Sequence, residues 1–390
     1  MNENNNTVVV NHLPTPTWNR LGVNRAFVNL DTLPKTDNFV DYTITNSELI
    51  TIEKKNTPDA VAWADSFTGG IRREAYVSGK APIYQAQNFA TGMGKDYTSF
   101  IESIVPQTDI FSVEENQKLS APVILNWDFQ TDGKSASQQI IHAKKNSEST
   151  FLYVQKSPKD KSGHVAIETK VILEDGAKLN LIKVNLLGEG FILMDDTAVM
   201  ESDNTEFDFT QILLGSDKTY TGCYSDQAGT NSIFNINSGY MVDKEHILDM
   251  NYVACQRGTK AQSKIYVKGS LRDNAFKTYR GTIDSRKGSK ESIGDEQEDV
   301  LLLNEGVINK SMPILLTEEE EVEARHGATI GNLSPDVLFY MGTRGIDKPT
   351  AEMLITMGHL LSITNTIPDE TTVQNIRHFI KEAFYNNEYI

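Results

Sequence analysis

One histidine stands in a setting that could bind a metal ion. His326 is followed by Gly327 and lies within residues 325–331, whose sequence is RHGATIG. A neutral imidazole is a good ligand for iron, and its second nitrogen can be oriented by a neighbouring carboxylate or carbonyl. The same residue could instead make only hydrogen bonds where a strand meets a helix. Metal ligation and a purely structural role are both open on this observation.

Two groups of carboxylates precede this histidine. The first group is Asp295, Glu296, Glu298 and Asp299. Two carboxylates on either side of a sugar bond are the catalytic pair of glycosidases, but crowding in one segment is more typical of a polar turn. The second group is the run 318–323, EEEEVE, which could attract ferrous iron because carboxylates are hard ligands. Its alternative is a solvated loop that keeps an edge strand from pairing.

The cysteine residues of the chain do not indicate a further reactive site. The chain has two cysteines, Cys223 and Cys255. Two thiols form neither a four-thiolate zinc site nor a disulfide framework, and the sequence around them shows no obvious environment that would lower the pKa of either thiol. We expect ordinary buried thiols, with carriage of persulfide sulfur as the alternative. No Gly-x-x-x-x-Gly-Lys-Ser/Thr sequence occurs, so no phosphate-binding loop is predicted.

Composition argues against two classes of partner. The chain has 390 residues and a formal net charge of −16, and so acidic a protein repels phosphate backbones. No apolar run approaches the ~20 residues of a membrane helix. The first residues, MNENNN, lack the basic and apolar regions of a secretory signal. We therefore expect a cytoplasmic protein that binds neither nucleic acid nor membrane.

Short strands are predicted through the middle of the chain, over residues 111–330. Apolar and polar residues alternate in residues 164–173 and 178–187, and this period of two places every second side chain on one face of a sheet. Turn sequences separate such runs, as at residues 175–176 (DG) and 237–239 (NSG). A sandwich, a barrel and a β-solenoid all fit this rhythm, and no strict short repeat selects the solenoid.

Helices are predicted towards both ends. Residues 1–110 indicate a mixed N-terminal domain of small helices and strands, with a short helix near residues 98–104. A helix start is predicted at residues 334–336 (SPD), because serine can cap, proline suits the first helical position and aspartate favours the positive end of the dipole. Two more helices are predicted after residues 347–349 (DKP) and near residues 368–370 (PDE).

These predicted C-terminal helices carry more apolar surface than a lone three-helix cap needs. The residues concerned are Leu338, Phe339, Tyr340, Met341, Met353, Met357 and Leu360. Methionine is common on adaptable interfaces and aromatic residues are enriched in interface cores, so the set is a candidate docking surface. The alternative is that these side chains pack against one another or against the β domain.

At this junction the sequence resembles the SufB/SufD family of iron–sulfur cluster assembly scaffold proteins. The shared pieces are, in order, residues 279–283 (YRGTI), 300–304 (VLLLN), 313–315 (PIL), 326–331 (HGATIG), 338–340 (LFY) and 344–346 (RGI). Their order and spacing match the family across roughly a fifth of the chain.

The resemblance implies a mainly β fold with a right-handed parallel β-helix core over residues 111–330. A mixed domain (1–110) would precede the core, and a helical domain (331–390) would follow it and dock an ABC-type ATPase, SufC. The chain would be a non-catalytic scaffold that pairs with SufB to assemble and deliver nascent iron–sulfur clusters. His326 would ligate a transient cluster at the partner interface, and this chain alone would hold none stably.

Two positions separate the branches of the family. SufB-like chains carry a cysteine just before the Leu-rich strand, where Glu298 stands nearest here, and they read His-Glu-Ala-Thr where residues 326–329 read His-Gly-Ala-Thr. Both departures favour the SufD branch, and with it half of a shared site. The alternatives are a homodimer, as of a SufB-like scaffold, and a β-helical carbohydrate-active enzyme.

Overall fold

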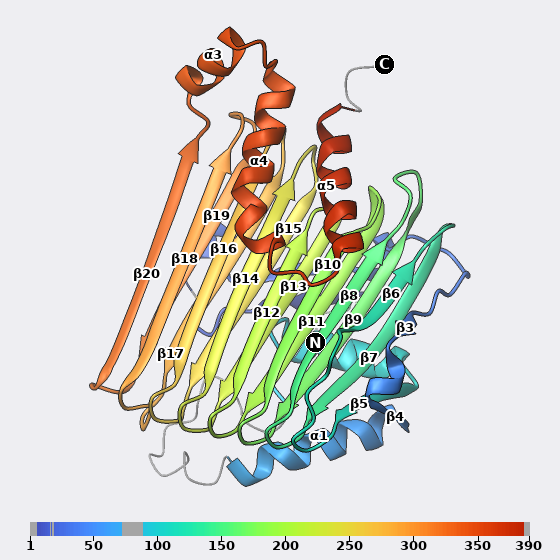
Figure 1. The fold of residues 1–390 in the computed structure, drawn as a ribbon, viewed down its shortest axis with the longest axis vertical. Coiled ribbons are helices and arrows are strands. Elements are labelled where there is room, and N and C mark those ends of the chain that lie inside the picture. Colours follow the sequence, from blue (N-terminus) through green and yellow to red (C-terminus); the bar gives the residue numbers. More distant parts are fainter. Residues whose placement is uncertain (1–5, 16, 18, 72–88, 386–390) are drawn as a thin grey trace.

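Alternating apolar strands wind into a parallel β-solenoid, which forms the body of the protein (Figure 1). The computed structural model describes residues 6–15, 17, 19–71 and 89–385. Successive strands alternate between two facing sheets, and each strand pairs in parallel with the strand one coil earlier and one coil later. The mainly β fold and the parallel β-helix that the resemblance implied are therefore confirmed.

The first sheet, called sheet I, holds the odd-numbered coil strands. They are β5 (Gln107–Val113), β7 (Gly133–Ala143), β9 (Ser162–Leu173), β11 (Gly190–Glu201), β13 (Lys218–Gln227), β15 (Ile247–Gln256), β17 (Phe276–Ser285) and β19 (Ile308–Thr317). Before them, β4 (Thr51–Asn56) adds to β5 in the antiparallel direction.

The second sheet, called sheet II, holds the even-numbered strands. They are β6 (Val123–Asp128), β8 (Glu148–Lys156), β10 (Lys178–Leu186), β12 (Glu206–Leu213), β14 (Ile233–Val242), β16 (Gln262–Leu271), β18 (Ser292–Leu302) and β20 (Val322–Asn332). Here β3 (Thr43–Thr45) pairs with β6 in the antiparallel direction. Both sheets thus begin with an antiparallel strand and end on a parallel one.

The interior between the two sheets is filled by the alternating side chains that the sequence predicted. Phe207 stacks on Phe234 of the next coil with ring centroids 6.1 Å apart, and both are fully buried. The coils are held in register at their turns, where asparagines of adjacent coils bond to one another. Asn146 Nδ2 donates to Asn116 Oδ1 and Asn231 Nδ2 to Asn204 Oδ1, each at 3.1 Å.

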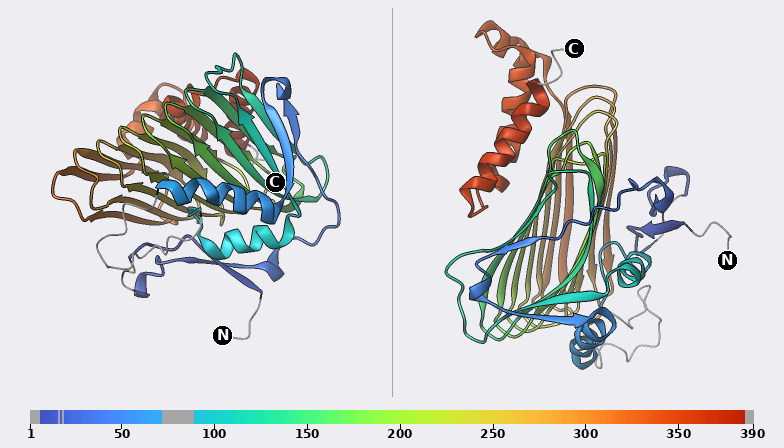
Figure 2. Two further views of the ribbon diagram at one scale, coloured as in Figure 1. Left: turned by 90° about the horizontal axis from the view of Figure 1, so that it is seen from below. Right: turned by 90° about the vertical axis from the view of Figure 1, so that its right-hand side faces the viewer.

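The N-terminal segment covers the outer face of sheet I (Figure 2). Its elements are β1 (Thr7–Val10), β2 (Ala26–Asn29), α1 (Thr57–Ile71), α2 (Lys95–Ile104) and the 3-10 turns Asn19–Leu21, Leu30–Thr32 and Ser47–Leu49. The expected short helix near residue 98 is α2. Arg280 of β17 fixes this segment, because its Nη1 donates to Asp249 Oδ1 at 2.6 Å and Asn11 Nδ2 donates to the same oxygen.

Three C-terminal helices follow β20, on the opposite side of the solenoid (Figure 2). They are α3 (Pro335–Thr343), α4 (Lys348–Thr364) and α5 (Glu370–Tyr385), close to the three predicted starts. Asp347 caps α4 by accepting a hydrogen bond from the Thr350 backbone N–H at 2.9 Å. Ser334 makes no such side-chain cap at α3. Gly345, at φ 81°, provides the left-handed turn between α3 and α4.

Helices α4 and α5 pack on the outer face of sheet II through a second apolar core. Leu360 and Ile363 of α4 lie over Gly239 of β14, where a Cβ would come within 3.2–3.3 Å of their methyl carbons. None of the helices in the described part of the chain is both long and apolar enough to cross a membrane. The division of the chain near residues 110 and 330 stays a prediction, although β5 begins at Gln107 and β20 ends at Asn332.

Candidate functional site

The last coil of the solenoid, formed by β19 and β20, has no described neighbour on its outer edges. Almost every residue of β20 is exposed, including Ile330 at 49%. Edge strands with free backbone groups are templates for pairing with another chain. This exposed coil is called the open end below, and His326 lies on it.

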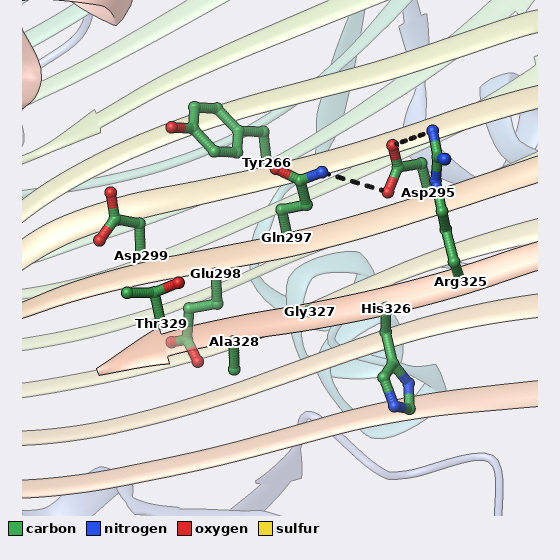
Figure 3. A pocket seen from close by; sticks show the side chains of 10 residues that line it. All are labelled: Tyr266, Asp295, Gln297, Glu298, Asp299, Arg325, His326, Gly327, Ala328 and Thr329. Atoms are coloured by element: carbon green, nitrogen blue, oxygen red, sulfur yellow. Dashed lines mark hydrogen bonds and ion pairs between the residues drawn. The ribbon is translucent and has the colours of Figure 1, made fainter. Parts of the chain in front are cut away.

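His326 points towards the interior at the open end. On the neighbouring strand β18 the buried residues alternate, and Glu296 and Glu298 are among them, so they face the interior. His326 is in register with Glu296, and Ala328 with Glu298, which places both on the interior side of β20. Figure 3 shows His326 and Ala328 on one side of the strand and Arg325 and Thr329 on the other. The imidazole is therefore exposed at the mouth of the core.

A buried ion pair lies one strand behind this mouth. Glu298 Oε1 accepts from Lys277 Nζ of β17, and their side chains are 2% and 0% exposed. Lys277 Nζ also donates to Ser311 Oγ of β19 at 3.2 Å. Burial lowers the pKa of Lys277, while the adjacent Glu298 carboxylate opposes that shift. The glutamate nearest the position of the SufB-type cysteine is therefore tied to a lysine.

A second buried carboxyl lies beside this pair. Tyr279 Oη donates to Glu296 Oε1 at 2.8 Å, and Gly281 leaves the space that this contact occupies, since a Cβ there would collide with both atoms. Burial raises the pKa of Glu296 to about 8, despite the hydrogen bond from Tyr279. Within the described residues, Glu296 Oε2 has no hydrogen-bond partner. At neutral pH this side chain is mainly a neutral acid in the core.

The other two carboxylates of the segment face outward. Asp295 Oδ2 accepts from Arg325 Nη2 at 3.0 Å, and Asp299 lies 3.8 Å from Lys268 Nζ. They border a shallow pocket of about 330 Å³ over the last strands of sheet II (Figure 3). Glu298 and His326 line the same pocket, but Glu296 does not, and Glu298 is paired with Lys277. All three carboxylates that line the pocket are thus held by cations, which does not favour a glycosidase pair.

The acidic run before β20 forms a turn that is tied to the turn of the preceding coil. Lys290 Nζ donates to Glu321 Oε1 at 2.8 Å, and the Gly288 backbone N–H donates to Glu319 Oε2 at 3.0 Å. Among the described residues, no three histidine, cysteine or acidic side chains are arranged to hold a metal ion. The ligand role of His326 therefore stays a prediction.

Both cysteines are buried, and burial disfavours the thiolate form of each. Cys223 lies in the interior of the solenoid, and burial raises its pKa well above the usual value. Cys255 lies on the outer side of sheet I beside Tyr224 and Val253, and burial raises its pKa to about 12. Since the thiolate is the reactive form, both residues are protonated thiols at neutral pH.

The seven residues of the candidate docking surface are divided by the structure. Phe339 and Tyr340 are 75% and 60% exposed on α3, a helix without buried residues. Leu338 and Met341 of α3 are partly buried. Met353 and Leu360 are buried between α4 and sheet II, with Met357 packed at their margin. Of the seven, Phe339 and Tyr340 of α3 are therefore the exposed ones, and the docking role stays a prediction.

Sequence reasoning missed Lys277 and Tyr279 as members of this site. Tyr279 and Gly281 belong to the YRG piece that carried the family resemblance, which was a usable signal. For Lys277 the sequence offers only the period of two within β17 as a signal. In the structure this residue is in register with Asn309 and contacts Glu298 from the opposite sheet.

Comparison with known proteins bears on the identity of this fold and site. The family model described as "SUF system FeS cluster assembly, SufBD core domain" matches residues 129–359. The iron–sulfur cluster assembly protein SufD of Bacillus subtilis is 32% identical over 113 residues, covering 29% of this chain and 26% of the relative.

Two further relatives match longer stretches. An iron–sulfur cluster assembly SufBD family protein of Pyrococcus horikoshii is 26% identical over 265 residues, covering 67% of this chain and 59% of the relative. The SufD protein of Escherichia coli is 24% identical over 178 residues, covering 46% and 42%. The chain thus spans between about a quarter and three-fifths of these relatives' lengths. Since the family model covers more than half of the chain, the protein belongs to the SufBD family of the SUF iron–sulfur cluster assembly system.

Proposed function

We propose that this protein is a SufD-like, non-catalytic scaffold subunit that pairs with a SufB-like protein and binds a SufC-like ABC ATPase. The observation that carries the proposal is the open end, where two free strand edges surround an exposed imidazole. A partner that adds its own strands there would bring its side chains up to His326. The interface binds the nascent iron–sulfur cluster as cargo, and the complex is located in the cytoplasm.

The chemistry of the open end fits a shared and labile site. His326 offers one nitrogen ligand, while Glu298 is paired with Lys277 and is not free to bind iron. Thiolates hold iron–sulfur clusters, so a partner cysteine would supply the ligand that this chain lacks. A site with an imidazole and few thiolates retains a cluster less firmly, which suits transfer to apo-proteins.

The ATPase is expected to bind at α3. This helix projects beyond the end of β20 and carries Phe339 and Tyr340 in an exposed position (Figure 1). Exposed aromatic side chains of this kind are characteristic of interface cores. The chain itself has no phosphate-binding loop sequence, so ATP hydrolysis would belong to the partner.

Co-expression with SufB-like and SufC-like proteins, followed by anaerobic reconstitution, tests the proposal. We expect a stable complex with iron–sulfur absorbance, and loss of that absorbance in His326→Ala while the complex stays intact. His378→Ala is the matched control, because this side chain is 70% exposed on α5 and forms an ion pair with Glu382 one turn away. If the chain forms no complex with either protein, the proposal is overturned. Unchanged cluster assembly in His326→Ala would show that His326 is not a ligand.

A homodimer through the same open end is the second candidate. It would juxtapose two copies of His326 and two Lys277–Glu298 pairs without a thiolate. Measurement of the molecular mass in solution, with and without the SufB-like protein, separates the two assemblies. A homodimer that persists when the SufB-like protein is present at equal concentration would favour this alternative.

A further inference from the structure

Glu296 has a buried oxygen atom that the described part of the chain leaves without a hydrogen-bond partner. Its side chain is 1% exposed, and its Oε1 accepts from Tyr279 Oη of β17 at 2.8 Å. Its Oε2 has no partner among the described residues. A buried polar atom without a partner costs free energy, so the few that native proteins keep call for an explanation. Glu296 Oε2 is thus free to bond to one further group.

The residues around Glu296 point to His326 as that group. On one side, β16 places Ile265 in register with Glu296, and this side chain is apolar and 1% exposed. Across the interior, Gly281 lies against Glu296 Oε1 and has no side chain to offer. On the other side, β20 places His326 in register with Glu296. Neighbouring strands lie about 4.8 Å apart, so the carboxyl and the imidazole are adjacent on the interior side.

The strand that carries His326 leaves its imidazole room to turn towards Glu296. The interior-facing residues two positions before and after it on β20 are Ala324 and Ala328, whose side chains are single methyl groups. The imidazole itself is exposed, and exposed side chains change rotamer within picoseconds to nanoseconds. A rotation of the side chain therefore brings the ring to the carboxyl, and neither strand has to move.

We propose that Glu296 is the positioning residue of His326: its Oε2 shares a hydrogen with imidazole Nδ1, which leaves Nε2 directed towards the partner subunit. The inference rests on the proposed function, because it assigns a role beside the predicted ligand. Nδ1 is the ring nitrogen nearer to the backbone, so it is the one that meets a carboxyl from the adjacent strand. Histidines that bind metal ions almost always bond through their other nitrogen to a carboxylate, a carbonyl oxygen or water. Glu296 supplies that bond from within this chain.

The hydrogen shared by Glu296 and His326 changes its place when Nε2 binds iron. Before binding, the carboxylic acid donates to Nδ1, and Nε2 carries a hydrogen of its own. On binding, the Nε2 hydrogen leaves to water as a proton, the shared hydrogen moves to Nδ1, and the carboxylate accepts from it. Such a release of protons accompanies metal binding in general, because ligands bind deprotonated. Tyr279 still donates to Oε1 and stabilises the carboxylate.

Two substitutions of Glu296 separate the contact in the free chain from its effect on ligation. Glu296→Met fills much of the same volume and removes both oxygens. Glu296→Gln keeps an acceptor for Tyr279 and offers an amide N–H to Nδ1, so the contact in the free chain is kept. After ligation, however, that amide N–H faces an Nδ1–H, because the amide oxygen is engaged by Tyr279. Glutamine should therefore hold the free imidazole and still weaken iron binding.

Glu201→Met is the matched control for loss of a buried carboxyl. Glu201 is fully buried on β11, in an earlier coil, and accepts from Ser225 Oγ at 2.6 Å. Circular dichroism checks the fold of each variant. If Glu296→Met does not fold, the double variant with Tyr279→Phe takes its place, since removal of both partners of a hydrogen bond can be nearly neutral.

The first measurement uses the full chain with isotope-labelled histidine and reads the ring nitrogens of His326 by NMR. The signal that is missing in His326→Ala gives the assignment. We expect the Nδ1 shift of a hydrogen-bonded nitrogen in the wild type, in Glu296→Gln and in Glu201→Met, and the shift of a solvated imidazole in Glu296→Met. A His326 signal that is the same in Glu296→Met and in the wild type would overturn the inference.

The second measurement titrates ferrous iron, without oxygen, into the complex with the SufB-like and SufC-like proteins. We expect Glu296→Met and Glu296→Gln to bind iron about 10- to 100-fold more weakly than the wild type, the usual loss when the partner of a ligand is removed, and Glu201→Met to bind like the wild type. Equal affinity in Glu296→Met and the wild type would overturn the inference and leave the proposed function standing. Failure of the wild type to form the complex would overturn the proposed function, whatever the NMR signals of the isolated chain.

Discussion

Replacing Lys277 by Met should destabilise the protein strongly, because it leaves a carboxylate unpaired in the core. The side chains of Lys277 and Glu298 are 0% and 2% exposed, so water cannot take over the lost contact. Removing one partner of a buried pair typically costs about 3–5 kcal/mol of unfolding free energy. Methionine fills nearly the same space, so little of the expected loss comes from packing.

Urea unfolding followed by far-ultraviolet circular dichroism measures this loss, with two comparisons. Lys290→Met removes an exposed pair, whose side chains are 54% and 61% exposed, and should cost less than about 1 kcal/mol. A double variant, Lys277→Met with Glu298→Leu, removes both charges and should recover most of the stability, since apolar replacement of a buried pair is often neutral.

The pH dependence of the single variant supplies a further check. Without Lys277, Glu298 must be protonated to remain buried, and protonation is easier at low pH. The stability deficit of Lys277→Met should therefore be smaller at pH 5 than at pH 8. A deficit under about 1 kcal/mol at pH 8, or a double variant no more stable than the single one, would refute the account of a charge pair in the core.

Two other predictions concern neighbouring features. Because the pKa of Glu296 is raised to about 8 on folding, wild-type stability should fall as pH rises from about 4.3 through 8. Glu296→Gln keeps the acceptor for Tyr279, so it should unfold at higher urea than the wild type at pH 9 and at similar urea at pH 5. Leu360→Ala should cost about 2–5 kcal/mol in urea unfolding. Phe339→Ala, at a 75% exposed position, should cost under about 0.5 kcal/mol yet weaken ATPase binding in a pull-down, and an equal loss of stability in both would contradict the division of the candidate surface.

Much of the local structure follows from the sequence, because local signals decide it. The alternating residues 164–173 and 178–187 lie within or nearly coincide with β9 and β10. The helix-start sequences also hold: proline at the first positions of α3 and α4 marks both starts within a residue. Such features depend on side-chain period and backbone preference, which neighbouring residues alone determine.

The solenoid itself could not be derived from a repeat, because its coils differ in length. Residues that bond across adjacent coils are 27 apart at Asn204 and Asn231, but 30 apart at Asn116 and Asn146 and 31 apart at Asp273 and Asn304. Turns of unequal length preserve the stacking while they remove any fixed period. Only the family resemblance selected the solenoid from the three β architectures that the strand rhythm allowed.

The interior charges could not be predicted either, since the period of two does not say which set of residues faces inward. In β18 both alternating sets contain carboxylates, and only the opposite sheet, with Lys277 and Tyr279, shows that Glu296 and Glu298 are the buried ones. For the C-terminal helices the difficulty was similar. Met353 and Leu360 have the composition of an interface, and the interface that they form is with sheet II of the same chain.

The open end brings these observations together. The Lys277–Glu298 ion pair lies between β17 and β18, and the following coil, β19 and β20, separates it from solvent. The attraction between opposite charges grows as water is excluded. A partner strand that covered this end would therefore strengthen the Lys277–Glu298 pair and would also occupy the free edge of β20. His326, exposed on the interior side of that strand, would then face the partner's side chains in a drier environment. We expect pairing at this end to protect both β17 and β18 from hydrogen exchange, because closure of the coil and burial of its charges are one event.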